Sequence, residues 1–281
     1  MILVRSHRFA LVALLALALL GAGCGDDEGD EPQDGGQEPA AEEFELVNPG
    51  ALTVGSDIPF PPFEQGRAPD YEGFDIDLAR EIARRLELET RIQDTPFDTI
   101  FRDLAQGKFD AVASATTITE ERERAVDFSD PYYAAEQALL VEAGGEIQAV
   151  DDLAGAIVGV QDGTTGADYV NDETEARAVR GYGEADDAYN ALQAGQVNAV
   201  IIDLPAAQDA ARQTEGLEVA TAIETGEQYG IAFQEDADAL REAANDALAE
   251  LKRDGTYEEI YRQWFNRAPP QSILEATHQP S

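Results

Sequence analysis

Short apolar runs alternate with longer segments of helical period along most of this chain. Four of the runs have the composition of buried strands, at 51–54, 111–113, 157–160 and 199–202. Amphipathic segments follow them, and in 75–86 the apolar residues recur every three or four positions after Asp75, the predicted N-cap. The alternation of strand and helix predicts an α/β fold with largely parallel sheets and right-handed crossovers.

This order of strand and helix occurs twice, which predicts two lobes. An apolar strand at 137–141 leads away from the first series, and the final helices, near 237–253 and 257–265, are free to return to it. The expected boundaries are 49–135 with 227–268 for the first lobe, 136–226 for the second and 269–281 for a tail. The chain is expected to cross between the lobes near 134–137 and 226–230.

The first 48 residues have a different composition. Arg5 and Arg8 precede a short apolar run that ends in small residues before Cys24, as in a secretory signal with a lipidated cysteine, although Gly21 stands where such signals usually have leucine. We therefore expect a signal peptide at 1–23 and lipidation at Cys24, against the alternative of a plainly cleaved signal. Residues 24–48 are rich in acidic side chains, glycine and proline, which predicts a disordered tether.

The charge and the cysteine content exclude several classes of partner and site. The net charge of −38 makes nucleic acid an implausible partner, because binding would bring like charges together. Cys24 is the only cysteine, so no disulfide framework or cysteine zinc site is available. Only Lys108 and Lys252 are lysines, which fits either a salty habitat or an arginine-preferring genome.

Polar residues at the end of one predicted strand have the chemistry of an anion receptor. Ser114 and Thr117 follow the strand at 111–113, where hydroxyl and N–H groups can point into a crevice. Thr119 has the position of an N-cap, and Arg122 follows three residues later, able to bind a carboxylate through two donors. The alternative is that Thr119 only caps a helix and that Arg122 only pairs with Asp127 or a nearby glutamate.

Several motifs in one order resemble the amino-acid-binding branch of the periplasmic solute-binding proteins that serve ABC importers. They are Gly73-Phe74-Asp75-Ile76-Asp77-Leu78, Thr117-Ile118-Thr119 with Arg122, Asp127-Phe128-Ser129-Asp130-Pro131-Tyr132, Gly163-Thr164-Thr165, the strand that ends in Asp203, and Tyr229-Gly230-Ile231-Ala232. The resemblance spans about 52–265. It implies a two-lobed type II binding-protein fold, two hinge crossings and a ligand held between closing lobes.

The resemblance also implies roles for particular residues. Arg122 would bind the ligand's α-carboxylate with the backbone N–H groups of Ala115 and Thr165 and the hydroxyl of Thr117, and Asp203 would bind the α-ammonium. Ala115 stands where glycine is frequent in the family. The expected ligand-binding set is Asp57, Phe60, Phe97, Ser114, Ala115, Thr117, Arg122, Gln161, Thr164, Thr165 and Asp203.

Three of these residues shape the rest of the expected pocket. Phe60 is expected to stack on the ligand and Phe97 to form a second wall, and ordinary core packing is the alternative for both. Asp57 is expected to lie with Gln161 toward the ligand's side chain, which favours a polar and possibly cationic amino acid. The alternative for Asp57 is a local Asx turn.

The expected function is a lipid-anchored, extracytoplasmic substrate-binding protein, a monomer that gives a free amino acid to an ABC permease in the cytoplasmic membrane. No catalytic residue, cofactor or metal is expected. The alternatives are a periplasmic dehydratase-like enzyme on the same scaffold, or a sensing domain that acts through a partner receptor. The enzyme hypothesis is weak because His7 and His278, the only histidines, lie in the signal and in the tail.

Overall fold

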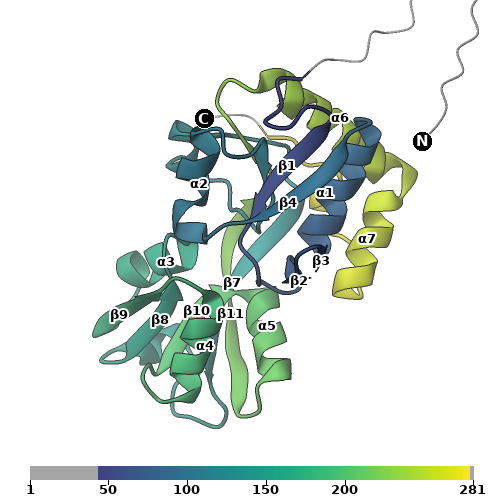
Figure 1. Ribbon diagram of the computed structural model, residues 1–281. Coiled ribbons are helices and arrows are strands. Elements are labelled where there is room, and N and C mark those ends of the chain that lie inside the picture. Colours follow the sequence, from purple (N-terminus) through teal and green to yellow (C-terminus); the bar gives the residue numbers. More distant parts are fainter. Residues whose placement is uncertain (1–43, 279–281) are drawn as a thin grey trace, which may run out of the picture. The chain divides into compact units, whose positions relative to one another are not determined.

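The computed structural model describes residues 44–278, so Cys24 and most of the predicted tether lie outside the described residues. Two five-stranded sheets, each with helices packed against it, form two lobes (Figure 1). The predicted α/β class and two-lobed architecture are therefore confirmed. None of the helices within 44–278 is long and apolar enough to cross a membrane.

The first sheet has the strand order β4-β1-β5-β12-β6. Its strands are β1 (Ala51–Ser56), β4 (Glu89–Asp94), β5 (Ala111–Val112), β6 (Asp127–Phe128) and β12 (Ala232–Phe233). Around it lie α1 (Phe74–Arg85), α2 (Phe97–Ala105), η1 (Arg122–Arg124), α6 (Asp238–Asp254), α7 (Thr256–Phe265) and α8 (Gln271–Leu274), with the hairpin of β2 (Gln65–Arg67) and β3 (Asp70–Glu72). In Figure 1, α2 lies on one side of β1 and α1 with α7 on the other.

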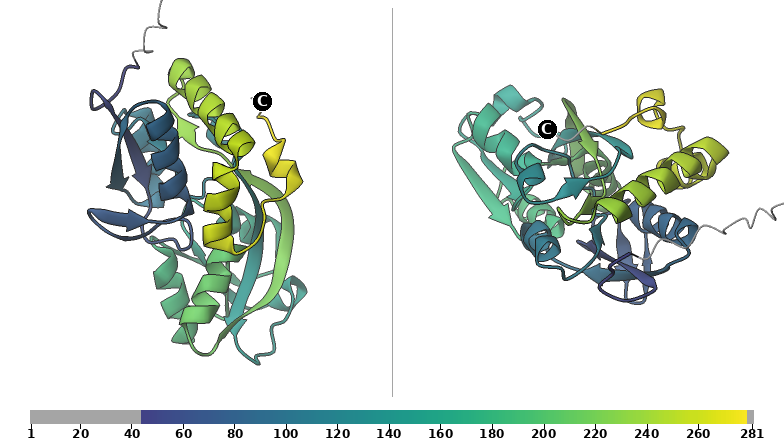
Figure 2. Two further views of the ribbon diagram at one scale, coloured as in Figure 1. Left: turned by 90° about the vertical axis from the view of Figure 1, so that its right-hand side faces the viewer. Right: turned by 90° about the horizontal axis from the view of Figure 1, so that it is seen from above.

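The second sheet has the strand order β11-β7-β10-β8-β9. Its strands are β7 (Tyr133–Glu142), β8 (Ile157–Gln161), β9 (Ala178–Tyr182), β10 (Ala199–Asp203) and β11 (Leu217–Tyr229). Its helices are η2 (Val150–Leu153), α3 (Thr165–Glu173), α4 (Ala185–Gln193) and α5 (Leu204–Gln213). Strands β7 and β11 pair antiparallel from Leu217 opposite Glu142 to Tyr229 opposite Tyr133, and these two long strands run from one lobe to the other (Figure 2).

Both sheets are mixed, where largely parallel sheets were expected. The parallel pairings are β1 with β4 and β5, and β8 with β9 and β10. Strand β7 joins the second sheet antiparallel to β10, and β12 joins the first sheet antiparallel to β5 and β6. The antiparallel strands follow from the two crossings, because a chain that leaves one βα series and later returns need not match the direction of that series.

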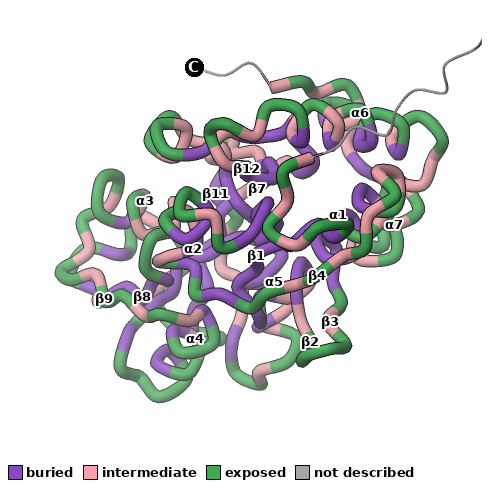
Figure 3. Tube along the Cα trace, turned by 45° about the horizontal axis from the view of Figure 1, so that its top comes forward, coloured by how far each residue is buried: buried purple, intermediate pink, exposed green. Residues whose placement is uncertain are grey.

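The core of each lobe lies along its sheet, where buried residues concentrate in the strands (Figure 3). Aromatic rings pack where the crossing strands meet the first lobe. The Phe63 ring lies 5.2 Å from that of Tyr133 and 5.4 Å from that of Tyr229, between ring centroids, and Phe265 lies 4.9 Å from Tyr133. This cluster fixes the crossing strands against a rigid apolar support.

The predicted N-cap role of Asp75 is wrong. Gly73 is the residue before α1, with a φ of 139°, and a Cβ there would lie 2.0 Å from the carbonyl oxygen of Phe63. Glycine is therefore required at that position. Asp75 instead lies one residue inside the helix, fully buried, and its Oδ2 accepts hydrogen bonds from the Ala115 N–H and the Tyr132 hydroxyl, both at 2.7 Å.

The predicted helix after Thr119 is a single 3₁₀ turn, η1. Thr119 Oγ1 accepts the Arg122 N–H at 3.2 Å, so its predicted capping contact is present without the helix. The strand β6 begins at Asp127, three residues after η1 ends, which leaves no room for an α-helix.

The tail is packed against the first lobe through His278, contrary to the expectation that no histidine lies within the fold. The His278 N–H donates to Asp130 Oδ1 at 2.7 Å, and its Nε2 lies 2.7 Å from Glu123 Oε1. His278 does not line the cavity described below. The dehydratase hypothesis therefore still lacks a histidine at that cavity.

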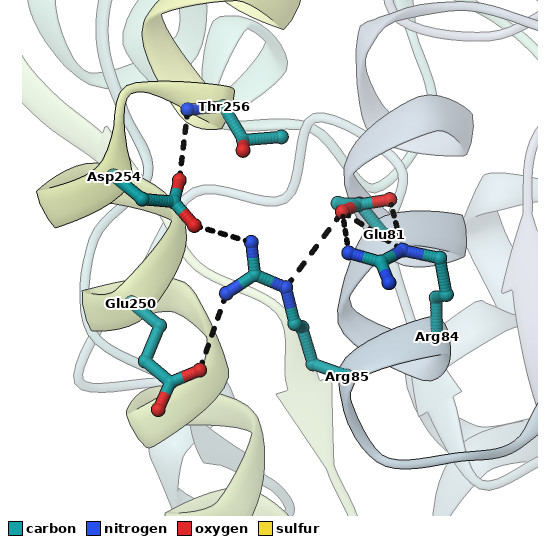
Figure 4. Close-up of polar contacts among 6 residues, drawn as sticks. All are labelled: Glu81, Arg84, Arg85, Glu250, Asp254 and Thr256. Atoms are coloured by element: carbon teal, nitrogen blue, oxygen red, sulfur yellow. Dashed lines mark hydrogen bonds and ion pairs between the residues drawn. The ribbon is translucent and has the colours of Figure 1, made fainter.

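An ion cluster on the surface joins α1 to α6 (Figure 4). Arg85 pairs with Glu81 on its own helix and with Glu250 and Asp254 on α6. The Thr256 N–H and then Arg85 lower the pKa of Asp254 to about 2. Arg85 and Glu81 are half-buried and their partners on α6 are exposed, so each pair adds little to stability, and the cluster mainly sets how the two helices pack.

Candidate functional site

A narrow cavity lies between the carboxyl ends of the strands of the two lobes. Every residue of the expected ligand-binding set lines it, together with Glu64, which sequence reasoning missed. The lining is Asp57, Phe60, Glu64, Phe97, Ser114, Ala115, Thr117, Arg122, Gln161, Thr164, Thr165 and Asp203. The structure thus brings these residues together from segments more than a hundred positions apart, at the edge where α/β sheets bind ligands.

Arg122 presents a guanidinium without a carboxylate partner. It donates from one Nη to the carbonyl of Thr117 at 2.7 Å and from the other to the carbonyl of Gly163, in the second lobe, at 3.1 Å. Its Cζ lies 4.7 Å from the ring centroid of Phe101 and 5.4 Å from that of Phe97. No ion pair among residues 44–278 includes Arg122, so the alternative of pairing with Asp127 is wrong. Burial lowers the pKa of Arg122, as for a cation that lacks a close counter-charge.

Asp203 lies across the same cavity, at the end of the buried strand β10. Its Oδ1 accepts from the Tyr229 hydroxyl at 2.6 Å and from Gln137 Nε2 at 3.1 Å. Burial raises the pKa of Asp203 to about 7, against the hydrogen bond from Tyr229. A cation bound beside it would favour the ionised carboxylate.

Asp57 and Gln161 meet across the two lobes. Gln161 Nε2 donates to Asp57 Oδ2 at 2.7 Å, and no Asx turn of Asp57 is present. The Asp57 N–H donates to Ser114 Oγ, whose hydroxyl in turn donates to Glu64 Oε1 at 2.8 Å. Ser114 therefore links the backbone of Asp57 to the carboxyl group of Glu64 within the first lobe.

This end of the cavity carries an excess of acid. Burial, and then Glu184, raises the pKa of Asp57 to about 7. Burial and Asp75 raise the pKa of the fully buried Glu64, whose Oε2 has no hydrogen-bond partner among the described residues. A cation bound beside carboxyl groups with raised pKa values would favour their ionised forms, so this end of the cavity suits a positively charged group.

Two threonines lie at the other end, and both contact Glu227 of β11. Thr117 Oγ1 lies 3.3 Å and Thr165 Oγ1 3.2 Å from Glu227 Oε2. Thr165 is also the first residue of α3, where N–H groups have no partner within the helix. Thr164 caps that helix by accepting the Ala167 N–H at 3.2 Å, and its own hydroxyl donates to the carbonyl of Gln161.

The expected use of the Ala115 N–H is contradicted. That group donates to Asp75 Oδ2 at 2.7 Å, so it is not free for a ligand. Ala115 has a φ of 46°, in the left-handed region, which gives a physical reason why glycine is frequent at this position in the resembling family.

Phe60 and Phe97 belong to apolar clusters and also line the cavity. Phe60 stacks on Phe63 with centroids 6.2 Å apart, and Phe97 packs edge-on against Phe101 at 5.9 Å. Each ring therefore belongs to the core and lines the cavity at the same time. Their role toward a ligand stays a prediction.

The missed residues Glu64 and Glu227 gave only a weak signal. Glu64 directly follows the proline-aromatic loop that leads from Asp57, and a charge beside Phe63 could have marked it. Glu227 lies in a hydrophilic segment whose pattern is typical of a loop. Only its position within the predicted crossing at 226–230 indicated that it lies near the cleft between the lobes.

The comparisons with known proteins agree with this architecture. Residues 52–267 match the family of bacterial extracellular solute-binding proteins, family 3. The L-cystine-binding protein TcyJ of Escherichia coli is 33% identical over 224 residues, which cover 77% of this chain and 83% of that protein. The ABC transporter arginine-binding protein 1 of Escherichia coli is 34% identical over 220 residues, which cover 76% of this chain and 90% of that protein.

The comparison with solved structures also identifies amino-acid-binding proteins. An ancestral arginine-binding protein bound to glutamine has 39% sequence identity and a TM-score of 0.75, over 78% of this chain and 99% of that one. The family match covers well over half of the chain and contains every residue that lines the cavity. This chain belongs to the family 3 bacterial extracellular solute-binding proteins.

Proposed function

We propose that the cavity binds one free amino acid, whose α-carboxylate pairs with Arg122 and whose α-ammonium pairs with Asp203, and that the protein gives this ligand to an ABC permease. The observation that carries the proposal is the guanidinium of Arg122, which lines the cavity with carbonyl oxygens as its only hydrogen-bond acceptors in the described structure. A zwitterion supplies the missing anion and, at Asp203, a cation for a buried carboxylate.

A cationic side chain is the further part of the proposal. Asp57 and Glu64 lie at the far end of the cavity, with Glu184 and Asp94 acting on Asp57 from outside it. One positive charge there would relieve several carboxyl groups at once. The arginine-binding relatives support this ligand class, although an ancestral arginine-binding protein also takes glutamine.

A thermal-shift screen against the twenty amino acids tests the ligand class. A ligand at a hundred times its dissociation constant adds about 2.7 kcal/mol to stability. We expect arginine, lysine or histidine to raise the melting temperature most, and glutamine less. If only leucine-like or acidic amino acids stabilise the protein, the cationic part of the proposal is wrong. If no amino acid does so, the proposed function itself is wrong.

We propose a carrier and not an enzyme, as the relatives named above are binding proteins. Carboxyl groups that titrate near neutrality could in principle transfer protons, so turnover has to be measured directly. Mass spectrometry of each stabilising compound after long incubation with the protein should return it unchanged. Loss of water or of carbon dioxide from the compound would favour the dehydratase alternative.

Lipid anchoring at Cys24 is also proposed, on the apolar run and small residues that precede it. Cys24→Ser should release the protein from the membrane fraction into the soluble extracytoplasmic fraction, because a single diacylated residue is the only expected anchor. Cell fractionation with detection of the protein measures this. Unchanged membrane retention of the variant would refute the anchor and leave the binding function untouched.

A further inference from the structure

Glu227 lies outside the expected ligand-binding set, yet it contacts residues of that set from both lobes. It lies on β11, at the crossing, between the two lobes. Its Oε2 has three donors around it: Thr117 Oγ1 of the first lobe at 3.3 Å, Thr165 Oγ1 of the second at 3.2 Å, and Gln137 Nε2 of β7 at 3.2 Å. A carboxylate on a crossing strand thus contacts both sides of the cavity.

The orientation of Gln137 in this group follows from its neighbours. Its Nε2 lies 3.2 Å from Glu227 Oε2 and 3.1 Å from Asp203 Oδ1, and both of these oxygens are acceptors. Only the amide NH₂ can serve two carboxylates, so it must face them. Gln137 therefore joins Glu227 to the residue proposed to bind the ligand's ammonium.

The two threonine hydroxyls are constrained in the same way. A hydroxyl carries one proton, and an ionised carboxylate can only accept. With their protons directed to Glu227, Thr117 and Thr165 can present only oxygen lone pairs to the cavity. Lone pairs favour a donor such as an ammonium and disfavour a carboxylate. The ligand's carboxylate is then left to Arg122 and to backbone N–H groups.

Glu227 is also accessible from outside the cavity. It lines a second, larger hollow beside the crossing strands, with Arg212 and Arg267 among the other lining residues. Glu227 is half-buried, so one side of it faces this hollow while Oε2 faces the threonines. Its charge also adds to that of Asp203 in the field at the Arg122 end of the cavity.

We propose that Glu227 is a positioning and specificity residue, which turns the Thr117 and Thr165 hydroxyls into acceptors and so selects ligands that carry an α-ammonium. This inference rests on the proposed function, since it assigns one end of the same cavity. It differs from the resemblance, which gave the Thr117 hydroxyl to the carboxylate and gave no role to Glu227.

The test compares L-arginine with des-amino-arginine, which keeps the carboxylate and the guanidinium and lacks the α-ammonium. Glu227→Gln keeps the shape of the side chain and removes its charge, and calorimetry measures both affinities. We expect L-arginine to bind about tenfold to a hundredfold more weakly to the variant, the scale of a hydrogen bond to a charged group. The affinity for des-amino-arginine should change by less than about threefold.

Other outcomes overturn the inference. An equal loss for both compounds means that Glu227 only supports the fold of the crossing, and a gain for both means that it competes with the ligand's carboxylate. The control is Glu224→Gln, an exposed residue of the same strand with the same charge change, which should alter neither affinity. Absence of L-arginine binding by the unmodified protein would overturn the cationic ligand itself, a different failure.

A second measurement uses L-arginine alone and does not depend on the affinity for des-amino-arginine. Thr117→Val removes one of the two hydroxyls through which Glu227 is proposed to act. In a Thr117→Val background, Glu227→Gln should weaken L-arginine binding by a clearly smaller factor than it does alone. Fully additive losses would show that Glu227 does not act through Thr117, and melting temperatures of all variants identify any that fail to fold.

Discussion

Arg122→Ala should abolish binding of every amino acid that the protein recognises, whatever its side chain. The substitution leaves the ligand's α-carboxylate buried without a cation, which costs about 3–5 kcal/mol, or roughly 150-fold to several thousandfold in affinity. Asp203→Ala should have a similar effect through the α-ammonium. Calorimetry with the amino acid that the thermal screen selects measures both losses.

Matched variants separate this effect from general damage. Arg124→Ala removes an exposed arginine of the same 3₁₀ turn and should leave affinity unchanged. Arg122→Lys keeps the charge and loses the planar pair of donors, so we expect an intermediate loss. The Arg122 variants also lose the hydrogen bond to Gly163 of the second lobe, so melting temperatures without ligand are needed beside the affinities. An Arg122→Ala protein that folds and still binds amino acids tightly would contradict the proposed role.

The lining of the cavity was predictable because it comes from strand ends and short polar motifs. Arg122, Thr117 and Asp203 each lie in or beside a recognisable motif, and parallel strands place their carboxyl ends at one edge of a sheet. The use of each polar group was less predictable. The Ala115 N–H binds Asp75 because the fold brings α1 under the end of β5, and nothing local in the sequence reports that contact.

In the fold, too, the features set by local sequence were predictable and those set by distant contacts were not. The βα series were visible from periodicity, since each strand and helix buries one side within a few residues of chain. The full length of β11 was not, because its residues from Glu218 to Gln228 are mostly half-buried or exposed and lack an apolar run. Pairing with β7 makes them a strand, and this pairing also brings Glu227 beside the two threonines that line the cavity.

Asp57 should make the preference for a cationic ligand depend on pH. Burial raises the pKa of its carboxyl group to about 7, with Glu184 and Asp94 adding to the rise and the Gln161 side chain and the Phe97 backbone opposing it. Without a ligand beside it, Asp57 is therefore mostly protonated below pH 7 and mostly ionised above it. A guanidinium or ammonium beside it favours the ionised form, so binding below pH 7 must release this proton.

The affinity ratio of arginine to glutamine isolates this effect, because both ligands share Arg122, Asp203 and Glu227. The ratio should rise about tenfold between about pH 6 and about pH 8, since one proton is lost from a group of pKa about 7. Asp57→Asn should remove this pH dependence. It should weaken the binding of arginine by about 2–3 kcal/mol, roughly 30- to 150-fold, while the affinity for glutamine changes little. Asp98→Asn, at an exposed position on α2, should leave the ratio and its pH dependence unchanged. If Asp57→Asn weakens the binding of arginine and of glutamine equally, Asp57 maintains the contact between the lobes through Gln161 and does not discriminate between charged and neutral ligands.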